Sequence, residues 1–190
     1  MATTTRLLGV EVAAATWMPR AVARQGAGTP RDWIRVPTGT AQRLLAATTR
    51  LVADLPADSD ADVVWHSGTN ELLVHTDRVG LTCNVGLLGV GVPVECDQSG
   101  PVTLTVPFAV GTDKDTRGLL MSTFDRVDGP DAVVGSWSEA VTAFAWESVL
   151  TLAQRLCAAA GKDASGRPLV PVAVGALRGS FLVRPMARHG

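Results

Sequence analysis

The chain has 190 residues, of which 46% are hydrophobic. It is therefore long and apolar enough to bury a full core as a single domain covering residues 1–190, and its composition excludes a disordered chain. The formal net charge is −1 with no long run of either sign, which excludes the basic surface that a nucleic-acid partner requires.

The N-terminal apolar run covers residues 7–17, but Glu11 interrupts it and a single cation precedes it, so it matches a secretory signal poorly. No stretch approaches the roughly 20 uninterrupted apolar residues of a membrane span. Cys83, Cys96 and Cys157 are odd in number and widely spaced in apolar surroundings, which favours reduced, buried thiols over a disulfide framework. We expect a soluble, cytoplasmic protein with no membrane partner.

The first part of the chain predicts strand, loop, strand and helix. Residues 7–16 alternate imperfectly and predict a strand, residues 19–30 have loop composition, and residues 32–36 predict a second short strand. Residues 39–55 carry a narrow apolar stripe at helical spacing, which predicts a helix lying on a surface. Pro56 is the expected end of this helix, because proline cannot continue the hydrogen-bond ladder.

The middle of the chain consists of short β-rich runs separated by turn residues. Six strands are predicted, at residues 63–66, 71–76, 79–85, 90–96, 102–110 and 118–127. Because the connections are short, consecutive strands should run antiparallel as a meander. The alternation is clearest in the fifth of these strands, where Val102, Leu104, Val106 and Phe108 would mark one face.

A long, mostly buried helix is predicted over residues 136–160. Ser136 and Glu139 have the spacing of a capping box, in which each side chain accepts a hydrogen bond from the backbone amide of the other residue. Apolar residues then recur at steps of three and four over a wide sector, which leaves only a narrow polar stripe. Gly161 is the expected stop, because glycine takes the left-handed conformation at a helix end without a Cβ clash.

The tail, residues 169–186, predicts two more strands that turn near Gly179. Pro171 and Pro185 cannot donate hydrogen bonds to a ladder, so these strands should lie at the edge of a sheet. The pattern leaves open whether the tail completes the sheet of its own chain or that of a partner.

Together these elements predict an α+β fold, in which an antiparallel β-meander packs against one long helix in the C-terminal half and an extra C-terminal β-hairpin follows. Over residues 7–161 this order resembles the helix-grip arrangement of the birch-allergen and START-type lipid-binding proteins. In those families a curved sheet wraps a long helix over an apolar cavity. The resemblance therefore implies an apolar small-molecule ligand.

Four residues are candidates for ligand binding: Trp146, Glu147, His75 and Arg117. Glu147 follows Trp146 on the long helix, and if that sector faces a cavity, desolvation would raise the pKa of the carboxyl and make it an acid or base. The alternative is a solvent-facing charge on the polar stripe. Histidine titrates near neutrality, so His75 could line a pocket, or it could be a hydrogen-bonded structural histidine. Arg117 ends a charged loop that has the composition of a hairpin tip.

Metal and phosphate sites find little support in the sequence. His66, His75 and Cys83 lie on neighbouring predicted strands, but a turn at residues 67–70 would place the two imidazole rings far apart along the ladder. The glycine-rich residues 80–91 are not followed by the helix start that a phosphate loop needs. A nucleophile elbow, paired metal-spacing cysteines and a dinucleotide fingerprint are all absent from the sequence. Neither a metal nor a cofactor is predicted.

Two functions remain as expectations. The first is a non-catalytic binding or assembly protein, with an apolar cavity or a homodimer interface formed by the long helix and the antiparallel sheet. Apolar surface beyond the needs of one core favours the homodimer. The alternative is a small-molecule enzyme with its active site in a cavity between the sheet and the long helix, where Glu147, His75 or Arg117 would supply polar groups.

Overall fold

The computed structural model describes residues 4–7, 10–13, 33–56, 58–110, 121–123 and 126–187. The helices are α1 (Thr38–Val52) and α2 (Asp131–Ala160), and a 3-10 turn, η2, covers Thr76–Arg78. The strands are β1 (Thr4–Leu7), β2 (Val10–Ala13), β3 (Ile34–Pro37), β4 (Asp62–Ser67), β5 (Asn70–His75), β6 (Gly80–Asn84), β7 (Leu87–Cys96), β8 (Gly100–Val110), β9 (Met121–Thr123), β10 (Leu169–Leu177) and β11 (Ser180–Ala187).

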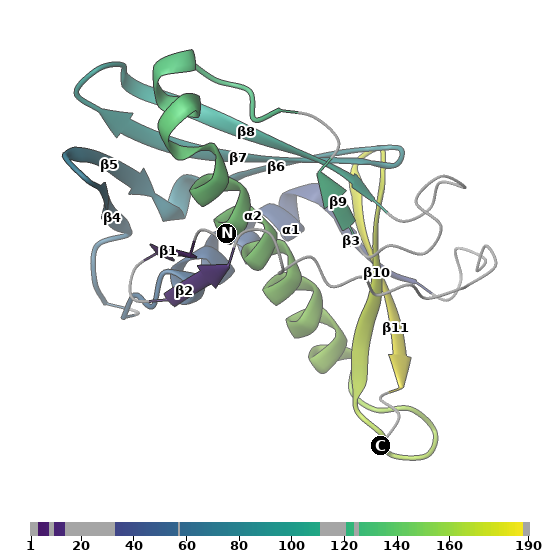
Figure 1. Cartoon of the computed structure of the whole chain (residues 1–190). Helices are drawn as coiled ribbons and strands as arrows, with labels where there is room; N and C mark the ends of the chain where they lie inside the picture. The colour runs from purple at the N-terminus through teal and green to yellow at the C-terminus, as the bar shows by residue number, and fades with distance from the viewer. Residues whose placement is uncertain are drawn as a thin grey trace.

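The predicted fold class is confirmed: antiparallel sheets pack against a long helix, and a β-hairpin follows at the C-terminus. A six-stranded sheet has the order β4-β5-β7-β8-β9, with β6 also paired to β7. A second, three-stranded sheet has the order β10-β11-β3, and β1 pairs with β2. Figure 1 shows α2 crossing one face of the six-stranded sheet, with α1 beside it. We call this face inner and the opposite face outer.

Strand order departs from a simple meander at one place. β5 and β6 do not pair with each other; both lie along the same edge of β7, where Val74 pairs with Val94 and Gly80 pairs with Gly91. The intervening residues form η2 where a hairpin turn was expected, so the chain continues in the same direction beyond it. Val92 and Pro93 of β7 therefore face a break in the neighbouring strand. A proline is tolerated there because no ladder hydrogen bond is needed from its nitrogen.

The inner face of the sheet follows the predicted alternation. β7 and β8 pair in continuous register from Leu87 opposite Ala109 to Cys96 opposite Gly100. Leu104, Val106 and Phe108 of β8 are completely buried, as expected for one face of this strand. Because side chains in a strand alternate between faces, the residues between them point outward.

Helix α2 begins five residues earlier than the capping box predicts. Its first residue is Asp131, its N-cap is Pro130, and no side chain caps it. Val133 and Val134 in the added turn are buried, so the helix gains apolar contacts that a start at Ser136 would leave unmade. The end is as predicted, since Gly161 has a φ of 96°.

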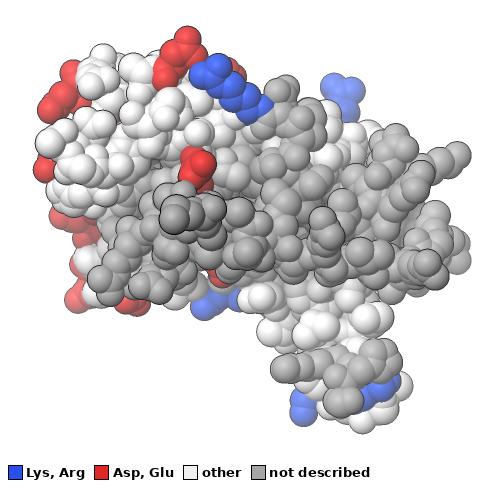
Figure 2. All heavy atoms as spheres, viewed as in Figure 1, with Lys and Arg blue, Asp and Glu red and all other residues white. Residues whose placement is uncertain are grey.

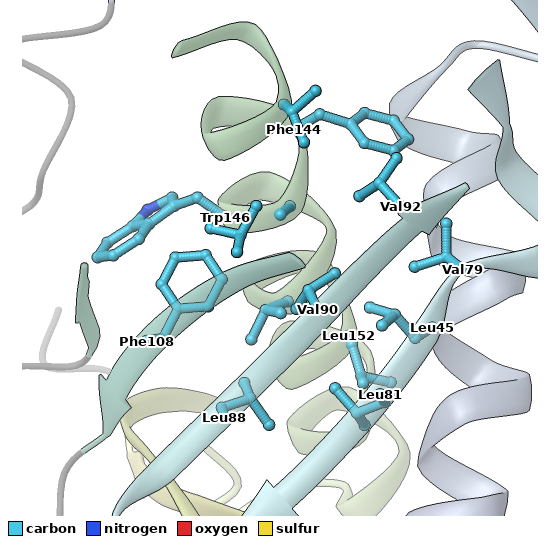
Figure 3. Packing of buried hydrophobic residues seen from close by; sticks show 14 of the residues in the cluster. Leu45, Val79, Leu81, Leu88, Val90, Val92, Phe108, Phe144, Trp146 and Leu152 are labelled. Atoms are coloured by element: carbon cyan, nitrogen blue, oxygen red, sulfur yellow. The ribbon is translucent and has the colours of Figure 1, made fainter. Parts of the chain in front are cut away.

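Large side chains fill the space between the sheet and the two helices (Figure 3). Trp65 of β4 meets Phe144 of α2 edge to face with ring centroids 5.2 Å apart. Phe108 of β8 packs on Trp146 of α2 with ring centroids 5.7 Å apart. Each large apolar side chain buried in this way stabilises the fold by about 1.5–3 kcal/mol.

Buried hydroxyl groups on α1 join the helical layer. Thr48 Oγ1 donates to the carbonyl oxygen of Leu45 within α1 at 2.8 Å and also reaches that of Ser148 on α2 at 3.3 Å. Thr49 Oγ1 donates to the carbonyl oxygen of Thr76 in η2 at 2.7 Å. These bonds satisfy polar groups that burial would otherwise penalise, and they fix α1 against both α2 and the break in the sheet.

The tail completes a sheet of its own chain. β10 and β11 form the predicted hairpin, and residues 180–183 of β11 pair with β3. Pro171 and Pro185 lie opposite each other in the hairpin. Pro171 is on the edge strand β10, and Pro185 lies beyond the end of β3. Both prolines therefore sit where no neighbouring strand needs their missing N–H group.

Two predicted strands differ from the structure near the undescribed parts of the chain. The strand expected over residues 7–16 is instead a hairpin of β1 and β2, in which Leu7 pairs with Val10. Alternation alone cannot distinguish one strand from two halves of a hairpin. The strand expected over residues 118–127 is described only as β9, and the charged loop at residues 111–117 lies outside the described residues. Among the described helices, none has the length and apolar character needed to cross a membrane.

Candidate functional site

Trp146, a predicted ligand-binding residue, is a buried core residue. Its indole packs against Phe108 at the sheet side of α2 (Figure 3). The indole Nε1 atom is buried and has no hydrogen-bond partner. A buried N–H group without a partner destabilises the fold, so it offsets part of the stabilisation that the indole gains by packing on Phe108.

Glu147, the next residue, is half-buried. Its Oε1 atom accepts a 3.4 Å hydrogen bond from Thr151 Oγ1, and its Oε2 atom is buried without a partner. Burial raises the pKa of the Glu147 carboxyl above its ordinary value, and the bond from Thr151 opposes this shift. The carboxyl thus has the environment of a group whose proton is held more tightly than usual.

His75 lies at the end of β5 and is clamped between two carboxylates. Its Nδ1 atom is 2.7 Å from Asp62 Oδ1 on β4, and its Nε2 atom is 2.8 Å from Glu95 Oε1 on β7. The imidazole is buried, with 6% of the residue exposed. The hydrogen bond with Asp62 is the largest cause that raises the pKa of His75, burial opposes it, and the bond with Glu95 adds to the rise. We call these three side chains the His75 clamp.

The predicted site residues do not converge. The partners of the His75 clamp alternate along β4 and β7 with the buried Val63 and Val94, so the clamp lies on the outer face, while α2 carries Trp146 and Glu147 on the inner face. Arg117 lies outside the described residues. In the part of the chain that the structure describes, no three His, Cys, Asp or Glu side chains are arranged to hold a metal ion.

Apart from Glu95 near the end of β7, the described outward positions of β6, β7 and β8 carry no ionisable side chain. We call this surface the neutral face; its outward positions are Gly80, Thr82, Asn84, Leu87, Gly89, Gly91, Pro93, Pro101, Thr103, Thr105, Pro107 and Ala109. Each of these residues is half-buried or exposed. A Cβ atom on Gly91 would lie 3.2 Å from the Thr103 methyl group, and one on Gly89 would lie 3.7 Å from the Thr105 methyl group, so threonine methyl groups lie beside the glycine backbone.

Sequence reasoning missed both carboxylates of the His75 clamp. Asp62 could have been found, because a turn that pairs Ser67 with Asn70 places Asp62 directly opposite His75. Glu95 could not have been found. It lies on β7, and the predicted meander placed β6 between β5 and β7, whereas in the structure β5 pairs with β7 directly. The neutral face was also missed, because the glycine-rich residues 80–91 were considered only as a phosphate loop or a bulged hairpin.

A polar pocket of about 140 Å3 lies where the β4–β5 turn, the β7–β8 turn and the start of α2 meet. Glu71 and Asp97 line it beside Trp137. The carboxylate of Glu71 is already 3.3 Å from His66 Nδ1. None of the buried polar atoms that lack a partner among the described residues belongs to this pocket, so nothing in it marks a ligand.

Charged side chains are unevenly distributed over the molecule. Figure 2 shows acidic side chains on the side where β4 and β5 lie and basic side chains at the foot, where β10 begins and β11 ends, with further basic side chains at the top of the view. Exposed residues of the first group include Asp58, Asp60 and Asp62, and those of the second include Lys162 and Arg167.

The three thiols differ in accessibility, and we expect them to differ in reactivity. Burial raises the pKa of Cys157 to about 11 and also raises that of Cys83, whereas Cys96 is half-buried with its Sγ atom 3.0 Å from Ser99 Oγ. Because the thiolate is the nucleophile, iodoacetamide at pH 8 should alkylate Cys96 first and the other two only on unfolding. Peptide mass mapping with and without guanidinium measures this; early labelling of Cys157 in the native protein would contradict the buried position.

Comparisons of the chain with protein-family models, with curated proteins and with solved structures gave no match. The class that the fold and the site define is an α+β protein with a helix-covered sheet, a neutral outer face and a buried His75 clamp beside it.

Proposed function

We propose that this chain is a non-catalytic assembly protein that forms a homodimer through the neutral face. The observation that carries the proposal is the scarcity of charge on this outer surface: among the described outward positions of β6, β7 and β8, Glu95 alone is ionisable. An antiparallel sheet with one face toward water normally alternates apolar residues inward with polar residues outward. Here glycine, proline, alanine and leucine occupy most outward positions, and threonine and asparagine are the polar ones.

A second copy of the chain fits this surface because the surface is self-complementary. In a two-fold dimer the same patch meets itself, so every charge on the patch would face a like charge near the axis. The neutral face avoids this repulsion. Its small side chains would allow two sheets to pack face to face about 10 Å apart.

The area of the neutral face is smaller than that of a standard interface. Strand β7 spans about 34 Å at ~3.4 Å per residue, and the three adjacent strands β6, β7 and β8 span about 14 Å at ~4.8 Å each, which gives at most about 490 Å2. A specific interface buries about 600–1,000 Å2 on each partner, so the proposed contact would also include residues at the border of the face, such as Leu73 of β5.

The other parts of the expected function have weaker support. An apolar ligand between the sheet and α2 would need space that core side chains fill (Figure 3). A small-molecule enzyme is favoured by one observation, the raised pKa of the half-buried Glu147, but the other polar groups of that proposal are not beside it. A cytoplasmic location belongs to the proposal and is supported by three free thiols.

A lysine in the middle of the neutral face should prevent the dimer. Thr103 is exposed and points outward from β8, so Thr103→Lys places two like charges close together across the dimer and should weaken association at least about tenfold. Sedimentation equilibrium measures the dissociation constant. The matched control is Thr69→Lys, which adds the same charge at an exposed turn outside the face. A wild-type protein that stays monomeric at 100 μM, or an unchanged constant in Thr103→Lys, would refute the proposal.

A further inference from the structure

The His75 clamp adjoins the neutral face. Glu95 is the next outward position on β7 after Pro93, and Asp62 pairs with His75 at the end of the β4–β5 hairpin. The carboxylate side chains of Asp62 and Glu95 are 43% and 42% exposed, while the imidazole between them is buried. A change in the charge of the buried ring therefore changes the net charge of the clamp at the surface, where the two carboxylates lie beside the proposed interface.

The geometry of the clamp favours a protonated ring. A neutral imidazole has one N–H group, so it can donate to one carboxylate and must turn a lone pair toward the other. An imidazolium donates to both, and each bond is then charge-assisted. With His75 protonated, one positive and two negative charges leave the clamp at −1; with His75 neutral, the same groups sum to −2.

The clamp holds three strands together at a weak point of the sheet. Between β5 and β7 only Leu73 and Val74 are paired, to Glu95 and Val94, before η2 interrupts the ladder. His75 stands at this interruption and ties β4, β5 and β7 together through its two nitrogens. Without the second hydrogen bond, the β4–β5 hairpin loses an attachment next to the break.

The other charged groups near His75 do not reverse the preference for a protonated ring. Asp62 faces it from β4 and Glu95 from β7, and both favour the protonated ring. From η2, Arg78 opposes protonation by repulsion, but its Nε atom lies 3.9 Å from Asp77 Oδ1, which partly balances it. α1 presents the uncharged Thr49 to this region, through the carbonyl oxygen of Thr76.

We propose that protonation of His75 controls self-association through the neutral face, with the dimer favoured while the ring is charged and weakened when the ring loses its proton. This inference rests on the proposed homodimer and names its regulation. Loss of the proton doubles the negative charge of the clamp in each copy, and the hairpin that borders the interface loosens at the same time.

The direction with pH follows from the raised pKa of His75. A group whose folded pKa lies above its unfolded value of about 6.5 stabilises the fold fully below that value, and this contribution disappears as the pH rises through the folded pKa. Dimer affinity should therefore be highest below the ordinary pKa of histidine, about 6.5, and should fall as the pH rises through the raised pKa of His75. The free energy of unfolding should lose its contribution from the clamp over the same interval.

Sedimentation equilibrium at pH 6, 7, 8 and 9 tests the inference. The wild-type dissociation constant should rise about tenfold, and His75→Gln should remove this dependence. His66→Gln is the matched control, because His66 is an exposed histidine at the other end of β4, 3.3 Å from Glu71, and should keep the wild-type profile. Since His75→Gln could fail to fold, Glu95→Gln provides a second variant: removing one carboxylate should move the midpoint of the transition to lower pH.

The outcomes separate the two proposals. A wild-type dimer whose dissociation constant is the same at all four pH values would overturn the inference and leave the homodimer standing. A dimer that weakens equally in wild type and His75→Gln would also overturn it, because general charge repulsion would then be the cause. A protein that is monomeric at every pH would refute the homodimer and, with it, the inference.

Discussion

Replacing Phe108 with alanine is expected to lower the free energy of unfolding by about 3–5 kcal/mol. Phe108 is completely buried in β8 and packs on the indole of Trp146. Truncation removes this aromatic contact and leaves a cavity between the sheet and α2, where neighbouring side chains on two rigid elements cannot close the gap. The loss is a large part of the 5–15 kcal/mol that stabilises a typical domain.

Urea unfolding followed by tryptophan fluorescence measures this loss. Val85→Ala is the control, since Val85 is 69% exposed at the β6–β7 turn and its truncation should change stability by less than about 0.5 kcal/mol. If Phe108→Ala does not fold, Phe108→Leu keeps most of the volume and should cost about 1–1.5 kcal/mol. Equal effects of the Phe108 and Val85 truncations would contradict the packing of β8 against α2.

Two glycines near the start of α2 should respond in opposite directions to alanine. A Cβ atom on Gly129 would overlap the side chain of Leu104, which is completely buried and has little room to move. Gly129→Ala should therefore destabilise the protein by about 1–3 kcal/mol. Gly135 lies within α2 and is exposed, with nothing within 4 Å of a built Cβ, so Gly135→Ala should stabilise by about 0.5–1 kcal/mol.

The pair also tests where α2 begins. Gly135 precedes the capping box at Ser136, and alanine there gains helix propensity only if the helix already covers this position. Thermal unfolding of both variants beside the wild type gives the comparison. A stabilised Gly129→Ala, or a Gly135→Ala with no gain, would contradict the observed start of the helix at Asp131.

Local patterns sufficed where one element could be interpreted without its neighbours. Alternation placed the buried face of β8, the turn before Asn70 set the β4–β5 register, and Gly161 marked the end of α2. These features depend on side-chain period and backbone freedom over a few residues, both of which are visible in the sequence.

The rest depended on contacts between distant parts of the chain. That β5 and β6 share one edge of β7 follows from η2, whose residues 76–78 have the composition of an ordinary turn. The capping box at Ser136 was a valid local signal, but burial of Val133 and Val134 extended the helix beyond it. For the candidate site, His75 was a candidate from the start, yet its environment depends on Glu95, which only the sheet order brings beside it.

Because β3 pairs with β11, the three-stranded sheet cannot form until the chain between these two strands has been synthesised. Arg35 Nε donates to Ser180 Oγ at 3.0 Å across a separation of 145 residues, and the N–H group at the start of α1, on Thr38, donates to the carbonyl oxygen of Gly179. At about 5–20 residues per second, a ribosome needs roughly 7–30 s to make the chain between these partners. Throughout this interval β3 has no strand to pair with, so its backbone N–H and C=O groups are open to other chains. The three-stranded sheet can close only after β11 has been translated.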